Sequence, residues 1–259
     1  MSSELPPTRV RAPAAALGPS ANFLLIALIF LGSGLAIGTG VADGSGAAFV
    51  FVMAGWLLGL CLHEFAHAFV AWKGGDAEIP QTGYLTLDPR LYADALSTIV
   101  LPLLFTILGG IGFPGGSVLV NTHLLRGKAW ISAVAAAGPA MNGIVLLVIA
   151  LLYRLAGEES DTLRAVLAVS ALFQGTAILL NLMPLPGLDG YGILRPWLPA
   201  SLRRFADQAA LHVNLVLAGL FLFSSTFGPA VFRASLAIIG LLGIEMADAR
   251  IGYGLIRLW

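Results

Sequence analysis

The chain has 259 residues, of which 58% are hydrophobic and 11% are charged, and its 14 basic and 14 acidic residues give a formal net charge of zero. Soluble domains carry about 25% charged residues, so this chain has too little charge to cover a water-exposed surface. It is also too hydrophobic for a disordered chain. The neutral balance argues against nucleic acid as a partner, and the single cysteine excludes an internal disulfide and a cysteine-based zinc site. An integral protein of the lipid bilayer is what this composition indicates.

Residues 1–20 are expected to form a cytoplasmic tail that contains Arg9 and Arg11. The first apolar run is too long for the core of a typical signal peptide, so we interpret it as a retained helix. A spanning helix needs about 20 mostly apolar residues, and six or seven crossings fit the sequence. The runs that lack Asp, Glu, Lys and Arg cover residues 21–42, 44–62, 95–125, 129–153, 165–188 and 208–232, with a shorter one at 234–244.

The run 95–125 is interrupted by Pro102, Pro114 and several glycines. If it dips into the membrane and returns, eleven of the 14 basic residues fall on the cytoplasmic side, as the positive-inside rule favours. A full crossing would divide the basic residues equally. The sequence therefore predicts an all-α polytopic membrane protein with about six spans and a re-entrant or membrane-surface segment between helices 2 and 3. We expect a multi-pass protein of the cell membrane with both termini in the cytoplasm.

The second run leads into the motif His63-Glu64-Phe65-Ala66-His67. Residues four apart share one face of a helix, so both imidazoles can point at one ion. This is the HExxH pattern, in which the glutamate acts as general base for a metal-bound water. Two imidazoles and one carboxylate, with a fourth position open to water, suit one zinc ion per chain. A buried polar cluster bonded to neighbouring backbone is the alternative interpretation.

Asp189 is the candidate third ligand because it follows an apolar run and would be costly there without a partner. Pro184, Pro186 and Gly187 are expected to open the helix just before it. A solvated aspartate in an ordinary loop is the alternative. His63 and Asp189 both lie late in their helices, so they meet only if the two helices run in the same direction. That requires an odd number of crossings between them, one from 129–153 and none from 95–125.

These residues resemble the site-2 protease family of intramembrane zinc metalloproteases. The family's HExxH appears at 63–67, its NxxPxPxLDG signature at 181–190 and its GPxxN motif at 138–142. The likeness covers roughly residues 45–200 and is to compact members without a PDZ domain. It implies His63, His67 and Asp189 as zinc ligands and Glu64 as catalytic base. It also implies a role for Asn181 near the scissile carbonyl.

The expected function is hydrolysis of peptide bonds in transmembrane proteins or peptides, within one membrane-embedded domain at 21–259 whose core is 45–200. Asn181 could donate a hydrogen bond to the developing oxyanion or join two helices. Asn142 could orient substrate or a ligand, or hold helices together. The segment 109–116 could pair with unwound substrate as an extended edge. A catalytically inactive family member and a polytopic transporter or binding protein with a zinc site are the alternative functions, although no internal repeat of the transporter kind is visible.

Overall fold

The computed structural model describes residues 18–92, 118–157 and 160–257, and within these every regular element is a helix. The side chains of Leu211, His212, Asn214 and Leu222 are not among those described. The elements are α1 (Ala21–Gly38), α2 (Ser45–Gly74), α3 (Ile79–Thr82), η1 (Tyr84–Thr86), α5 (Lys128–Leu155), α6 (Asp161–Asn181), α7 (Asp189–Leu194), η3 (Arg195–Trp197), α8 (Ala200–Phe223), α9 (Phe227–Leu241) and α10 (Met246–Ile256).

Four described helices, α1, α2, α5 and α6, are long and apolar enough to cross a membrane. The all-helical fold expected from the apolar runs is therefore confirmed for the described residues, whereas the count of six spans is not. Helix α6 is the central element, because 72% of its most apolar window is buried by protein, against 6% for α1. Phe51, Leu146 and Leu172 belong to the large apolar core that joins α2, α5 and α6.

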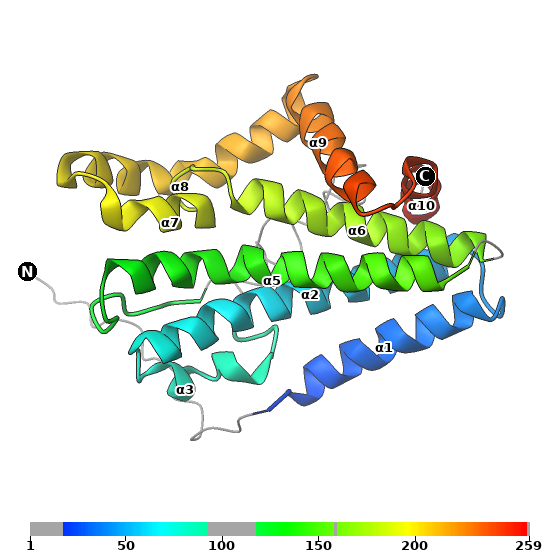
Figure 1. The fold of residues 1–259 in the computed structure, drawn as a ribbon, viewed down its shortest axis with the longest axis horizontal. Helices are drawn as coiled ribbons and strands as arrows, with labels where there is room; N and C mark the ends of the chain where they lie inside the picture. The colour runs from blue at the N-terminus through cyan, green and yellow to red at the C-terminus, as the bar shows by residue number, and fades with distance from the viewer. Residues whose placement is uncertain (1–17, 93–117, 158–159, 258–259) are drawn as a thin grey trace, which may run out of the picture.

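Helices α2 and α6 run in the same direction, and α5 runs between them in the opposite direction (Figure 1). Helix α1 is antiparallel to α2, since Asn22 at its start donates hydrogen bonds of 3.2 and 3.1 Å to the Asp88 carboxylate, beyond the end of α2. The C-terminal ends of α2 and α6 consequently lie at one end of the bundle. This is the arrangement that the expected metal ligands require.

The expected re-entrant segment falls largely on residues 93–117, outside the described part of the chain, as does the proposed extended edge at 109–116. Its two flanks are described and lie at the same end of the bundle. The Asp76 carboxylate, just beyond α2, accepts a 2.8 Å hydrogen bond from the backbone N–H of Asn121, and Gly74 O accepts one of 3.0 Å from Arg126 N. Residues 74–76 and 121–126, on the two sides of this segment, therefore lie at one end of the bundle.

The C-terminal helices differ from the expected last two spans. Helix α9 has 15 residues, and α10 begins at the end of the bundle opposite to Asp189. Arg164, in the first turn of α6, holds α10 at this end of the bundle. Its Nε lies 3.1 Å from Asp248 Oδ2, and its Nη2 lies 3.3 Å from Glu245 Oε1. This ion-pair network holds the start of α10 beside the start of α6, so the apolar run at 234–244 does not return to the metal-site end.

Candidate metal centre

Two buried histidines on α2 and one aspartate from α7 converge at the end of the bundle. His63 and His67 lie one helical turn apart, and their Nε2 atoms are 3.0 Å from each other. Asp189 Oδ2 lies 3.3 Å from His63 Nε2, and Oδ1 lies 3.3 Å from His67 Nε2. One potential ligand atom from each residue falls within 4.8 Å of the others. The structure thus brings together the three residues that the sequence indicated as ligands.

Asp189 reaches this position because α6 ends at Asn181, before the prolines, and the chain turns sharply back. Gly187 makes the turn with φ +91°, in the left-handed region that favours glycine. Asp189 then begins α7. The carboxylate form of this side chain is the one that binds a metal ion.

Helix α5 forms the third wall of the site. His67 Nδ1 donates to Val134 O over 2.7 Å, so the lone pair of Nε2 points toward His63 and Asp189. A backbone carbonyl that fixes the tautomer in this way is the usual partner of a metal-binding histidine. Gly138 packs directly on the imidazoles, because a Cβ there would lie 2.5 Å from Cε1 and Nε2 of His63 and closer still to Nε2 of His67.

Unpaired polar atoms test whether a metal suits this cluster. Four buried side-chain nitrogen or oxygen atoms lack a hydrogen-bond partner among the described residues, and three of them belong to His63, Glu64 and Asp189. Buried polar groups are normally bonded. Asp189 Oδ2 lies on the side of the two imidazole Nε2 atoms, so it is the unpaired atom that a metal ion bound there would satisfy. The donor set of two imidazoles and one carboxylate fits zinc with an open fourth position.

Glu64 is 2% exposed and lies directly beside the first histidine of the cluster. Its carboxylate is within hydrogen-bonding reach of the Val118 backbone, while its Oε2 has no partner among the described residues. Glu64 is not part of the three-residue ligand cluster. This position agrees with a group that handles a proton next to an ion rather than one that binds the ion.

The two candidate asparagines occupy different places. Asn142 is buried on α5, four residues after Gly138, whereas Asn181 is the half-buried last residue of α6. Neither side chain forms a hydrogen bond with another described residue, so the described contacts do not support their alternative role of joining helices. The role of Gly138 in bringing α5 against the imidazoles could have been found from the GPxxN motif, but Val134 contributes only its backbone and left no sequence signal.

The chain is 41% identical over 215 residues to "Putative zinc metalloprotease Rip2" of Mycobacterium tuberculosis, covering 82% of this chain and 81% of that protein. The Mycolicibacterium smegmatis protein of the same name is 41% identical over 249 residues, covering 93% of this chain and 94% of the relative. The chain belongs to the site-2 protease family of zinc metalloproteases.

A more distant relative in this family is "Putative zinc metalloprotease YwhC" of Bacillus subtilis, which is 30% identical over 174 residues, covering 64% of this chain and 77% of that protein. No family model matches the chain, and no solved structure gives a significant match. The resemblance to the site-2 protease family, based on three short motifs, is confirmed by relatives aligned over most of the chain. A metalloprotease associated with zinc and with membranes is therefore the coarse identity of this protein.

Proposed function

We propose that this chain is an intramembrane zinc endopeptidase that hydrolyses peptide bonds of transmembrane proteins. His63, His67 and Asp189 would hold one zinc ion. The convergence of their ligand atoms within 4.8 Å, with Asp189 Oδ2 left without a hydrogen-bond partner among the described residues, is the observation that carries the proposal. Residues 21–259 act as one membrane-embedded domain with its core at 45–200, and residues 1–20 form a cytoplasmic tail.

A zinc ion held by these three residues would act as a Lewis acid, which lowers the pKa of a bound water molecule to about 7 and polarises a carbonyl group. Glu64 takes a proton from the attacking water on its unpaired oxygen and passes it to the leaving amine nitrogen. Asn181, at the end of α6, donates a hydrogen bond to the carbonyl oxygen as negative charge develops on it. Asn142 holds the substrate backbone on the α5 side of the site.

The decisive comparison is between the wild type, Glu64→Gln and His63→Ala, purified as full-length chains. Glu64→Gln keeps the shape and the metal ligands but removes the base, so it should bind zinc like the wild type and lose about 10²–10⁴ in cleavage rate. His63→Ala should lose both zinc and activity. A wild type that binds no zinc, or a Glu64→Gln variant that cleaves a transmembrane peptide normally, would contradict the proposal.

The membrane arrangement has a separate test. Thr122 lies at the metal-site end of the bundle, and Ser160 lies at the start of α6 at the opposite end. Single cysteines at these positions, in a Cys61→Ala background, should react with impermeant reagents from opposite sides of the membrane, with Thr122 on the cytoplasmic side. Labelling of both from one side would refute this topology.

A further inference from the structure

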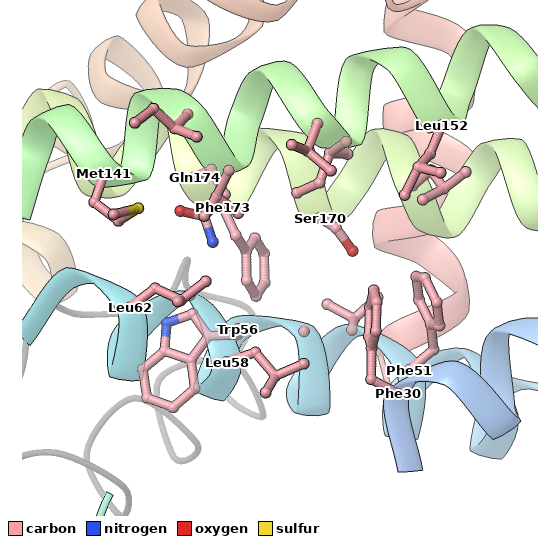
Figure 2. Close-up of a pocket in the computed structure, with 18 residues that line it drawn as sticks. Phe30, Phe51, Trp56, Leu58, Leu62, Met141, Leu152, Ser170, Phe173 and Gln174 are labelled. Carbon is pink, nitrogen blue, oxygen red and sulfur yellow. The ribbon is translucent and has the colours of Figure 1, made fainter. Parts of the chain in front are cut away.

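An apolar cavity of about 240 Å³ lies between α1, α2, α5 and α6 (Figure 2). Phe30, Trp56 and Phe173 line it together with other large apolar side chains. Its lining includes Leu62 and Met141, the residues directly before His63 and Asn142. Leu62 and Met141 mark the end of the cavity that is nearest along the helices to the metal centre, whose own residues do not line it.

Gln174 is the exceptional residue of this cavity. It is 5% exposed, and its Oε1 is the one buried unpaired atom, among the described residues, that belongs neither to the ligand cluster nor to the adjacent Glu64. Figure 2 shows its amide in the space between α6, α5 and α2. Gly59 of α2 leaves the room for it, because a Cβ at this position would collide with the amide nitrogen of Gln174.

The two other buried polar side chains on α6 satisfy their own hydrogen bonds. Ser170 donates to Val166 O over 2.7 Å, and Thr176 donates to Leu172 O over 2.9 Å and pairs with Ser235 at 2.9 Å. Gln174 has no such partner, although an unpaired buried amide is costly in apolar surroundings. Gln174 lies on the wall of the cavity with its Oε1 covered in this rotamer, so a ligand in the cavity would complete its hydrogen bonds once the amide turns.

The chemistry of the cavity restricts this ligand. The apolar walls suit aliphatic and aromatic side chains, and the amide of Gln174 offers one acceptor and two donors. A lipid acyl chain would fill the walls but leave Oε1 unpaired. An unwound transmembrane peptide has both apolar side chains and backbone N–H and C=O groups that require partners where water is absent. It therefore matches the walls and the amide together.

We propose that this cavity binds the unwound stretch of the transmembrane substrate next to the scissile bond, and that Gln174 hydrogen-bonds the substrate backbone there. The proposal rests on the proposed protease function and extends it with a specific subsite. Because the terminal torsion of glutamine is broad, rotation of the amide can present either its oxygen or its nitrogen to the peptide. Gln174 thereby compensates the backbone hydrogen bonds that the substrate loses when its helix opens.

The test compares Gln174→Leu with the matched control Thr176→Val, both in the full-length protein. Gln174→Leu should keep the zinc content, unfold at the same or a higher temperature, and lower kcat/KM for a transmembrane peptide about tenfold, as loss of one hydrogen bond supports. Thr176→Val should unfold at a lower temperature, because it loses a satisfied hydrogen bond. Its kcat/KM should stay within about twofold of the wild type, because this hydrogen bond lies away from the cavity.

Binding of a fluorescent transmembrane peptide to Glu64→Gln, with and without Gln174→Leu, gives a second readout that needs no turnover. Weaker peptide binding by the double variant than by Glu64→Gln would support the subsite. If the wild type fails to cleave, that failure would overturn the proposed function but not the subsite. Equal binding and equal cleavage with Gln174→Leu would overturn the subsite and indicate a lipid chain as the occupant. A lower unfolding temperature with unchanged binding would overturn it in favour of a structural role.

Discussion

Gly138→Ala should damage the metal centre although it replaces none of the metal ligands. The added Cβ would lie 2.5 Å from Cε1 and Nε2 of His63 and closer to Nε2 of His67. Neither ring can retreat freely, because His67 is held by its 2.7 Å hydrogen bond to Val134 O and His63 shares its helix. The methyl group must therefore push α5 away from α2 or turn the imidazoles out of position.

Overpacking of this kind costs about 1–3 kcal/mol, and changes in the groups that orient metal ligands typically lower metal affinity about 10–100-fold. We expect Gly138→Ala to lose zinc affinity in that range and to lose cleavage activity in parallel. Gly143→Ala on the same helix is the matched control. A Cβ there meets no atom within 4 Å, so the variant should bind zinc normally and be at least as stable, since alanine favours a helix by about 0.5–1 kcal/mol over glycine.

The assay is competition for zinc with a chelator of known affinity, on purified full-length variants, together with thermal unfolding. Gly138→Ala with the zinc affinity of the wild type would refute the direct packing of α5 on the imidazoles. A loss of equal size in Gly143→Ala would show that α5 tolerates no added methyl group at all, and would refute the assignment of the effect to the metal centre.

Three further outcomes follow from the packing. Gly252→Ala should strongly destabilise the protein in thermal unfolding, because its Cβ would collide with Ala165 O, whereas Gly254→Ala, with no atom within 4 Å, should have no such effect. Tyr153→Phe should cost about 1–3 kcal/mol in unfolding free energy, since its hydroxyl donates to Asp248 Oδ2 over 2.5 Å in a network at the start of α10. Removal of zinc by a chelator should lower the unfolding temperature of the wild type. The loss corresponds to about 2.7 kcal/mol when the initial free zinc is 100 times Kd. The unfolding temperature of His63→Ala should not change.

Much of the metal centre was predictable because its chemistry is local in sequence. Helical spacing alone puts His63 and His67 on one face, and the prolines after Asn181 end α6 where the chain must turn to present Asp189. Asp189, the third residue of the cluster, is predictable from its cost in an apolar environment. Longer contacts gave no such signal: the approach of Gly138 to the imidazoles depends on how α5 crosses α2, which hydropathy does not specify.

The C-terminal region shows where reasoning from hydropathy fails. The run at 234–244 is as apolar as a spanning segment, so it was counted toward the expected crossings. Its destination is decided by Arg164, whose contacts with Glu245 and Asp248 join residues more than 80 positions apart. Apolar length specifies that a segment prefers the membrane, whereas such long-range polar contacts specify which end of the bundle it reaches.

The polar residues inside the bundle divide into those that the fold satisfies and those that it leaves unpaired. Thr176 and Ser235 bond each other, and their contact holds α9 on α6. His63, Glu64 and Asp189 at the candidate metal centre, and Gln174 on the wall of the cavity, have unpaired atoms. Because an unpaired buried group lowers stability, its presence is best explained by a partner that arrives with function. We propose a metal ion as the partner of Asp189 Oδ2, and the backbone of an opened substrate helix as the partner of Gln174.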